Sequence, residues 1–174
     1  MKTALLAIDM QNLLVEEKPF AIEERLALWQ DSITKARQAG IETVYVRQND
    51  EEFATGSPGW EIHPAVAPLA DEKIVDKRYS SAFKGTDLKA YLDEQGIERL
   101  ILMGMSTNFC IDTTIKVAFE LGYSLAVIKD GTTTPYTADL PAKELIDQYE
   151  TIWSWSFAQV DTLENILRGN NERT

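Results

Sequence analysis

Three side chains capable of covalent or proton-transfer chemistry, Cys110, Asp9 and Lys77, each follow a short apolar run. Cys110 is the only cysteine, and it lies just after the run at 100–103, where a helix is expected over 109–121. The amino end of a helix carries partial positive charge and free N–H groups, which favour a thiolate over a thiol. Cys110 is therefore a candidate nucleophile; the alternative is a small buried hydrophobic residue.

Asp9 directly follows the apolar run at 4–8, and Lys77 directly follows the run at 73–76. In an open parallel sheet, ligands bind at the carboxyl ends of the strands, so a suitable strand order would bring both residues to Cys110. Each also has a purely structural interpretation. An Asp after a strand often caps a turn, and Lys77 lies in a charged stretch typical of a solvated surface.

His63 is the only histidine, and it lies before Pro64 in the long irregular stretch 48–71. A catalytic histidine would have to be this residue, which either lines a pocket or is a polar surface residue. A zinc site needs several His and Cys ligands, so no metal is expected. The cation beside an activated Cys110 would then be Lys77, which should lower the thiol pKa from about 8.5 by one unit or more.

Short apolar runs alternate with longer helical patterns, which is typical of a parallel sheet with crossover helices. The sequence predicts six strands, at 4–8, 43–46, 73–76, 100–103, 125–128 and 157–160. It predicts five helices, at 22–39, 86–95, 109–121, 141–149 and 161–168. The stretch 48–71 carries aromatic and apolar residues, which favour an ordered, packed loop. With no internal repeat or linker, we expect one α/β domain over 1–174.

Composition excludes several classes of protein. The chain has 174 residues, 44% of them hydrophobic and 26% charged, as is ordinary for a soluble globular protein. A net charge of −11 argues against a nucleic-acid partner. No apolar run approaches the roughly 20 residues of a membrane span, and the N-terminal stretch is typical of a first strand, not a signal peptide. A single cysteine fits a reducing compartment, so we expect a cytoplasmic protein without membrane partners.

The motifs resemble those of the isochorismatase-like cysteine hydrolases, a superfamily that includes nicotinamidases and N-carbamoylsarcosine amidases. The family's first strand and catalytic Asp match ALLAIDMQN, which contains Asp9. Its catalytic Lys and nucleophilic Cys match VDKRYSSAF and GMSTNFCID, which contain Lys77 and Cys110. The match runs from about Ala4 to Asp130 and more loosely to the end. The resemblance implies a Rossmann-like, three-layer α/β/α fold around a mostly parallel six-stranded sheet.

The resemblance also implies a mechanism. The Cys110 thiolate attacks an amide-type carbonyl and forms a covalent thioester, while Asp9 takes the thiol proton and passes it to the leaving amine. Lys77 holds the negative charge near both. The oxyanion is met by the backbone N–H groups of Cys110 and Ser106, with a cis peptide bond at Met105–Ser106. No cofactor takes part.

Two departures from other family members narrow the expected substrate. Metal-dependent nicotinamidases carry an Asp-x-His pair after the second strand, whereas the corresponding segment here, VYVRQNDEEF, has no histidine. Members that hydrolyse the vinyl ether of isochorismate typically lack the cysteine. We therefore expect metal-independent cleavage of a C–N bond in a small molecule. The alternatives are a catalytically silent small-molecule-binding protein on the same fold and an isochorismatase-type vinyl ether hydrolase.

Aromatic residues near these motifs are expected to line the substrate pocket. The candidates are Trp60, His63, Tyr79, Phe83 and Phe109. Core packing is the alternative for Phe83 and Phe109. Such a lining would suit a flat or partly apolar acyl group. Trp153 and Trp155 are interpreted as packing residues or a subunit contact, and the resemblance implies a homo-oligomer.

Overall fold

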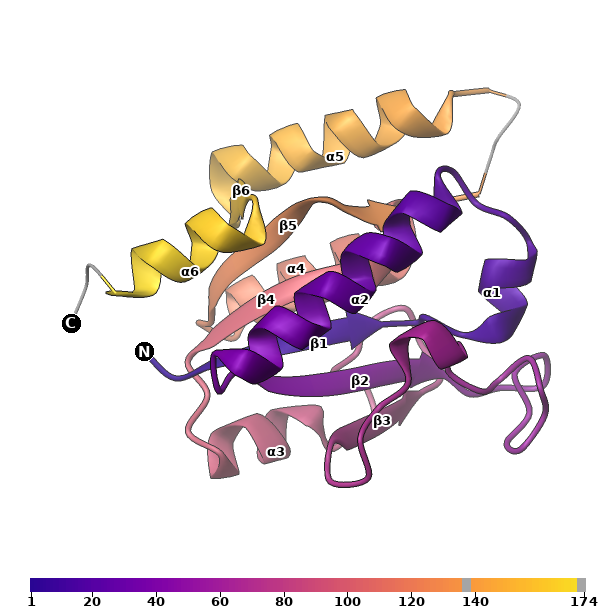
Figure 1. Ribbon diagram of the computed structural model, residues 1–174, viewed down its shortest axis with the longest axis horizontal. Helices are drawn as coiled ribbons and strands as arrows, with labels where there is room; N and C mark the ends of the chain where they lie inside the picture. The colour runs from indigo at the N-terminus through magenta and orange to yellow at the C-terminus, as the bar shows by residue number, and fades with distance from the viewer. Residues whose placement is uncertain (136–138, 172–174) are drawn as a thin grey trace.

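The structure is a computed structural model that describes residues 1–135 and 139–171 (Figure 1). Six strands form one sheet in the order β3-β2-β1-β4-β5-β6. Their bounds are β1 Thr3–Ile8, β2 Glu42–Gln48, β3 Lys73–Lys77, β4 Arg99–Met105, β5 Ser124–Thr133 and β6 Gln159–Asp161. All five neighbouring pairs are parallel, where the sequence predicted a mostly parallel sheet.

The central strands are apolar because both faces of the sheet are covered. Every residue of β1 and of β4 is buried. Along β1, Ala4, Leu6 and Ile8 pack into one hydrophobic core, and Leu5 and Ala7 into the other. Successive side chains of a strand point to opposite faces, so the sequence of a strand between two cores is a continuous apolar run.

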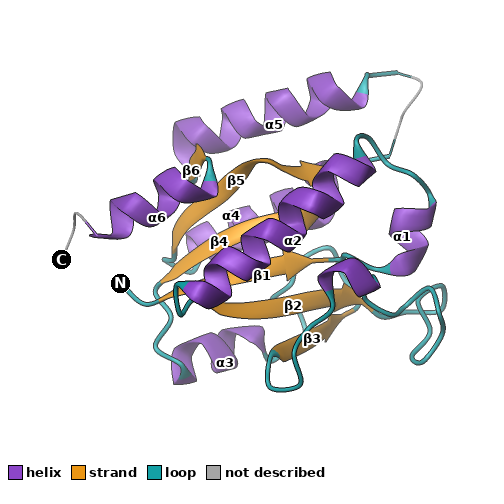
Figure 2. Cartoon of the chain, viewed as in Figure 1, coloured by secondary structure: helices purple, strands orange, loops and turns teal. Residues whose placement is uncertain are grey.

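Helices form the two outer layers (Figure 2). Their bounds are α1 Asn12–Glu16, α2 Ile22–Gln38, α3 Leu88–Glu94, α4 Asp112–Glu120, α5 Ala142–Ser156 and α6 Leu163–Asn171. Buried residues of α3, α4 and α5 share one core, and those of α2 and α6 share the other. The α/β/α layering therefore agrees with the sequence-based expectation. None of the described helices is long and apolar enough to cross a membrane.

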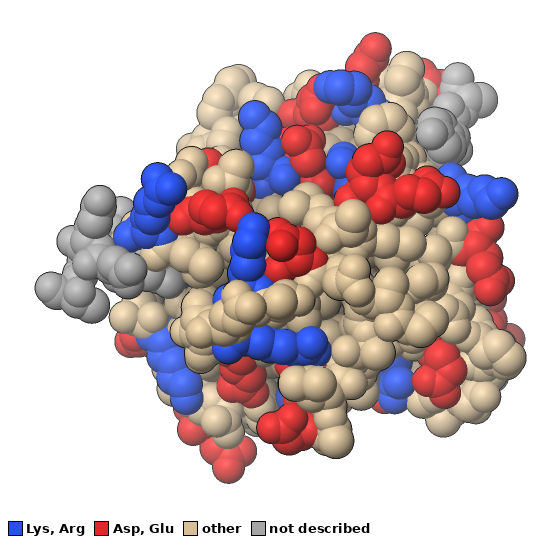
Figure 3. Space-filling model, viewed as in Figure 1, with Lys and Arg blue, Asp and Glu red and all other residues tan. Residues whose placement is uncertain are grey.

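The predicted helices differ from the observed ones mainly at their ends. The short helix α1 was not predicted, and α5 extends seven residues beyond the predicted end at 149, to Ser156. This extension buries Trp153 completely and leaves Trp155 80% exposed. Burial of one apolar face thus continues the helix through a β-branched stretch that is unfavourable by propensity alone. Acidic and basic side chains intermingle on the face shown in Figure 3.

The strand order creates a switch point between β1 and β4. From β1 the chain runs outward to β2 and β3 on one side, whereas from β4 it runs outward to β5 and β6 on the other. At such a point the loops leave in opposite directions and open a crevice at the carboxyl ends of the strands. The fold therefore places any ligand site at the ends of β1 and β4.

Candidate active site

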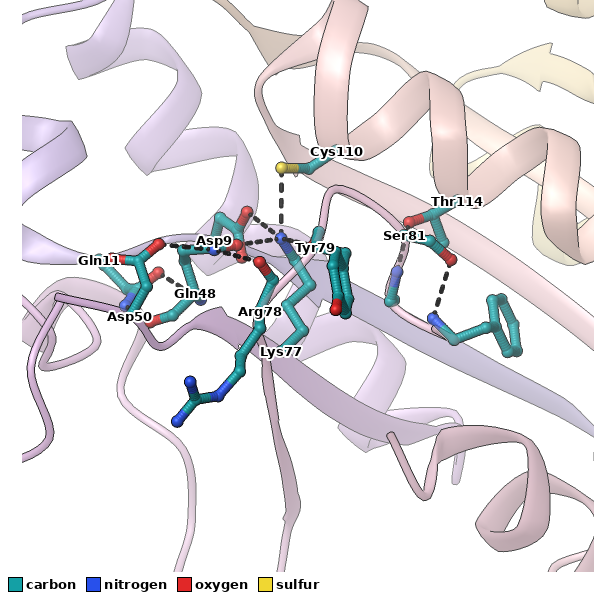
Figure 4. A network of polar contacts seen from close by, with 12 residues as sticks. Asp9, Gln11, Gln48, Asp50, Lys77, Arg78, Tyr79, Ser81, Cys110 and Thr114 are labelled. Atoms are coloured by element: carbon teal, nitrogen blue, oxygen red, sulfur yellow. Dashed lines mark hydrogen bonds and ion pairs between the residues drawn. The ribbon is translucent and has the colours of Figure 1, made fainter. Parts of the chain in front are cut away.

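The three candidate residues come from three strands that end at the same edge of the sheet. Asp9 directly follows β1, Lys77 is the last residue of β3, and Cys110 lies in a single π-helical turn, η2 (Thr107–Ile111), between β4 and α4. Figure 4 shows Cys110 above the Lys77 ammonium group and Asp9 to its left. The structure therefore brings together all three residues that the sequence singled out.

Lys77 is the centre of this cluster. Its Nζ lies 3.0 Å from Asp9 Oδ2 and 3.2 Å from Cys110 Sγ. The side chains of Lys77 and Asp9 are 0% and 2% exposed, so Lys77 is not a solvated surface residue. Asp9 caps no turn: Oδ2 contacts Lys77, and Oδ1 is buried without a hydrogen-bond partner among the described residues. Lys77 is therefore not at the solvated surface, and Asp9 is paired with it instead of capping a turn.

Burial and charge shift the proton affinities of the pair. Burial raises the pKa of Asp9 above its ordinary value, outweighing the opposite effects of Lys77 and Cys110. For Lys77, burial alone would lower the pKa, but the charges of Asp9 and Cys110 outweigh it and the pKa is raised. The ammonium group therefore stays charged, while Asp9 is a stronger base than an ordinary carboxylate.

The pKa of the Cys110 thiol departs from the sequence-based expectation. Burial, followed by the charge of Asp9, raises the pKa of Cys110 to about 12, against the smaller lowering effect of Lys77. The prediction of an unusually acidic thiol was therefore wrong. Removal from water and a neighbouring carboxylate raise the thiol pKa, and they outweigh the lowering expected from a position early in a helical segment. At neutral pH the resting cluster therefore holds a neutral thiol beside the charged Lys77 ammonium group.

Two further groups complete the surroundings of Lys77, and the sequence analysis missed both. Nζ also donates to Gln48 Oε1 at 2.7 Å and to the Tyr79 carbonyl at 3.0 Å. Gln48 ends β2, so the signal available in the sequence was a polar residue at the end of a buried strand. A backbone carbonyl accepts hydrogen bonds whatever its residue type, so this contact of Tyr79 with Lys77 could not be predicted from the sequence.

Gln11 anchors the segment that carries Asp9. It is fully buried, and its Oε1 accepts a hydrogen bond from the Gln48 N–H at 2.9 Å. Its Nε2 donates to the carbonyls of Gln48 and Trp60, both at 2.9 Å. With the bond from Asp9 N–H to the Val46 carbonyl at 2.8 Å, these contacts hold Asp9 in a left-handed conformation with φ of 52°, which few non-glycine residues adopt.

The segment that carries Cys110 has the cis peptide bond that the resemblance implied. The Met105–Ser106 peptide bond is cis. The Ser106 carbonyl accepts hydrogen bonds from the N–H groups of Phe109 and Ile111, at 3.1 and 3.2 Å, which closes the π-helical turn. In α4, which follows this turn, Thr114 Oγ1 accepts a hydrogen bond from the N–H of Ala82. This bond connects the loop after β3 to α4 (Figure 4).

The five residues expected in the pocket fall into three groups. Tyr79 and Phe109 are 51% and 60% exposed, and both neighbour the cluster along the chain. Phe83 packs against the core and stacks on Tyr123, with ring centroids 6.0 Å apart. This is the packing role that the sequence left open for Phe83. The other two residues belong to the loop after β2.

Trp60 and His63 stabilise that loop. The Arg47 guanidinium lies 3.5 Å from the centre of the Trp60 ring, and Trp60 Nε1 donates to Asp76 at 3.1 Å. His63 Nδ1 accepts from the Ala65 N–H and so caps the short 3₁₀ turn at 64–66. The side chains of both residues therefore have structural partners, and the loop is ordered as predicted.

Two hollows in the described surface lie away from the cluster, at the amino ends of the strands. One is lined by Thr3, Glu42 and Thr43, and the other by Arg99 and Ser124. Ligands of such sheets bind at the opposite edge, so we place the candidate site at the cluster. In the described part of the chain, no three His, Cys, Asp or Glu side chains gather to hold a metal ion.

Comparison with known proteins identifies the family of the chain. A family model described as the isochorismatase domain matches residues 3–162. The isochorismatase family protein YddQ of Bacillus subtilis (strain 168) is 31% identical over 97% of this chain and 100% of its own length. A streptothricin hydrolase of Streptomyces noursei is 31% identical over 80% of the chain, which spans about half (51%) of that enzyme. The ureidoacrylate amidohydrolase RutB of Yersinia enterocolitica is 25% identical over 95% of the chain and 89% of its own length.

Solved structures share the fold. The crystal structure of an isochorismatase family protein superposes with a TM-score of 0.88 at 28% identity, covering 91% of this chain and 97% of the other. N-carbamoylsarcosine amidase from Thermoplasma acidophilum has the same fold, with a TM-score of 0.78 at 22% identity over 93% of this chain and 96% of its own. With the family match over nearly the whole length, the chain belongs to the isochorismatase family of hydrolases.

Proposed function

We propose that this chain is a metal-independent cysteine hydrolase that cleaves the C–N bond of a small amide-type molecule through a thioester on Cys110. One observation carries the proposal most directly. The Lys77 ammonium group contacts a carboxylate at 3.0 Å and a thiol sulfur at 3.2 Å in a buried site. A base, a cation and a nucleophile in contact make up the unit that nucleophilic catalysis requires.

In the first step, Asp9 removes the thiol proton as Cys110 Sγ attacks the carbonyl carbon. The raised pKa of Asp9 makes it a better proton acceptor than an ordinary carboxylate. The raised pKa of Cys110 means that the thiolate forms only as the substrate reacts. The negative charge moves from Asp9 to sulfur while Lys77 contacts both. This arrangement supports general-base activation, not a preformed thiolate.

The remaining steps return every group to its starting state. Collapse of the tetrahedral intermediate breaks the C–N bond, and protonated Asp9 gives its proton to the departing nitrogen. Asp9 then takes a proton from water, which attacks the thioester and releases the carboxylic acid. The proton returns to Cys110. The backbone N–H groups of Ser106, just before η2, and of Cys110, within η2, are proposed to hold the oxyanion.

The name of one relative favours an amide-type substrate. Ureidoacrylate amidohydrolase is named for C–N hydrolysis, and streptothricin hydrolase is another relative named as a hydrolase. Tyr79 and Phe109, both partly exposed beside the cluster, are the proposed aromatic wall for the acyl group. The proposed reaction needs neither a metal nor a cofactor.

A screen of small amides, ureides and carbamoyl compounds, with ammonia or amine release as the readout, tests this function. The matched control is Cys110→Ala. Turnover by the native protein that disappears in the control supports the proposal. Binding of these compounds without turnover would support the silent binding protein instead, and cleavage of a vinyl ether that survives in Cys110→Ala would support an isochorismatase-type reaction.

A further inference from the structure

Lys77 has more hydrogen-bond acceptors than donors. Its ammonium group carries three N–H bonds but contacts four partners: Asp9 at 3.0 Å, Gln48 at 2.7 Å, the Tyr79 carbonyl at 3.0 Å and Cys110 at 3.2 Å. Gln48 and the Tyr79 carbonyl take no part in the proposed proton transfer. Together they occupy two N–H bonds and leave one for Asp9 and Cys110 to share.

The orientation of the Gln48 amide is fixed by what lies on its other side. Its Nε2 donates to Asp50 Oδ2 at 2.8 Å and to the Arg78 carbonyl at 3.2 Å. A rotated amide would place Oε1 against these two acceptors and its NH₂ group against the Lys77 ammonium, so both contacts would become repulsive. Figure 4 shows Gln48 between Asp50 and Lys77.

Asp50 is in turn held as an acceptor. Its Oδ1 accepts from the N–H groups of Glu52 and Phe53, at 3.0 and 3.1 Å, which leaves Oδ2 for Gln48. Burial alone would raise the pKa of Asp50, but the hydrogen bonds from Gln48 and from these two N–H groups outweigh it and the pKa is lowered. The carboxylate therefore remains ionised and cannot donate to Gln48.

We propose that Gln48 is a positioning residue that occupies one N–H of Lys77, and that Asp50 fixes the Gln48 amide in the orientation this requires. Because Lys77 then has only one N–H for Asp9 and Cys110 together, it cannot fully satisfy the Asp9 carboxylate. Asp9 stays basic enough to accept the thiol proton, and the shared N–H follows the charge from oxygen to sulfur. The catalytic meaning of this arrangement rests on the proposed function, whereas the arrangement itself does not.

Two variants test the proposal by different routes. Gln48→Met removes the acceptor at similar size. In Asp50→Asn, the two N–H groups of residues 52 and 53 keep the Asn oxygen in place, so its NH₂ group faces Gln48 Nε2 and forces the Gln48 amide to rotate. Both changes free an N–H of Lys77 for Asp9 and should lower the pKa of Asp9. Gln30→Met, on the exposed face of α2, is the matched control.

Titration of the Asp9 side-chain carboxyl by ¹³C NMR reads this effect without a substrate. The titratable groups that act on Asp9 are Lys77 from β3 and Cys110 from η2. We expect the Asp9 pKa to fall by about 0.5 unit or more in both variants and to stay unchanged in the control. On any amide that the screen identifies, kcat should fall about tenfold with KM nearly unchanged. The acidic limb of the pH profile of kcat should move to lower pH.

An Asp9 pKa that is unchanged or raised in either folded variant overturns the proposal. A loss of kcat without a shift of the acid limb also overturns it, because that pattern indicates only structural damage. If Gln48→Met does not fold, Asp50→Asn decides the question alone. If no amide is turned over, the proposed function fails, but the NMR titration still decides the role of Gln48.

Discussion

The carboxyl ends of the strands hold two polar clusters that include buried charged groups: the Lys77 cluster (Asp9, Gln48, Lys77, Cys110) and the Arg25 cluster (Arg25, Trp29, Asp130, Glu150). In the Arg25 cluster, the side chains bond to the backbone of β5. Arg25 Nε donates to the Thr132 carbonyl at 2.9 Å, Trp29 Nε1 donates to the Gly131 carbonyl at 2.7 Å, and Glu150 accepts from the Asp130 N–H at 2.8 Å. The ion pair itself, Arg25–Asp130, is long at 4.0 Å.

In the Lys77 cluster, reactive side chains face one another instead. Asp9 and Cys110 both contact the same ammonium group, and Asp9 Oδ1 is buried without a partner among the described residues. A buried polar atom left unpaired costs stability, so this cluster is not arranged for stability alone. Burial of charge at a strand end therefore does not distinguish an active site from a structural support. The difference lies in whether the partners are backbone groups or titratable side chains.

The largest expected effect is the loss of turnover when the Lys77 cluster is broken. Asp9→Asn and Cys110→Ala should each reduce kcat by about 10³-fold or more, and the double variant should be little worse than either single one. Because both residues act in the same proton transfer, loss of either one already abolishes it, and the two reductions in kcat do not multiply. The measurement is steady-state turnover of an amide from the screen. Independent, multiplying losses would mean that the two residues act separately.

The Arg25 cluster should respond in the opposite way. Arg25→Met leaves the Thr132 carbonyl without its buried donor, which should destabilise the protein by about 1–3 kcal/mol and reduce kcat by only a few-fold. Thermal or urea unfolding, measured beside turnover, checks both parts. An Arg25→Met variant as stable as the native protein but without activity would place Arg25 in the catalytic machinery. It would contradict the distinction between a catalytic Lys77 cluster and a structural Arg25 cluster.

Asp9→Asn should also separate thiol reactivity from catalysis. The charge of Asp9 helps to raise the pKa of Cys110 to about 12, so removing that charge lowers the thiol pKa and increases the thiolate fraction at a given pH. Alkylation of Cys110 by iodoacetamide at pH 8 should become about tenfold faster for each unit of pKa lost, although turnover is abolished.

Lys77→Met is the comparison for this experiment, because its loss removes a contribution that lowers the thiol pKa. Alkylation should become slower than in the native protein. Equal alkylation rates in all three proteins would show that neither charge acts on the thiol.

The smallest expected effect is that of chelation. Dialysis against EDTA should leave turnover unchanged, because the proposed mechanism uses only side chains and backbone groups of the Lys77 cluster. The metal content of the purified protein is measured in parallel by elemental analysis. Stoichiometric zinc, iron or manganese, with activity lost on removal and restored on return, would contradict the metal-independent mechanism.

The sequence predicted the strands and the three residues at their ends, because buried parallel strands leave long apolar runs and reactive residues stand out where those runs stop. It did not predict the surroundings of these residues. Gln48 ends β2 as an ordinary polar residue, and its role depends on contacts with Lys77 and Asp50. The thiol pKa was predicted in the wrong direction because burial and the nearness of Asp9 are properties of the folded chain.

The expected pocket residues illustrate the same limit. An aromatic residue next to a motif can face either the site or the core, and residue type does not decide between them. Phe83 stacks on Tyr123 and packs against the core, whereas Phe109, one residue before Cys110, is 60% exposed. The difference depends on which way the chain turns after β3 and in η2, and that is set by tertiary contacts.

The most direct test is to look for the thioester on Cys110. The enzyme is quenched in acid during turnover of an amide from the screen, and its intact mass and peptide masses are measured. We predict an added mass equal to the acyl group, located on the peptide that contains Cys110 and absent from Cys110→Ala, which should be inactive. Turnover that continues in Cys110→Ala, with no adduct on the native enzyme, would contradict covalent catalysis by this cysteine.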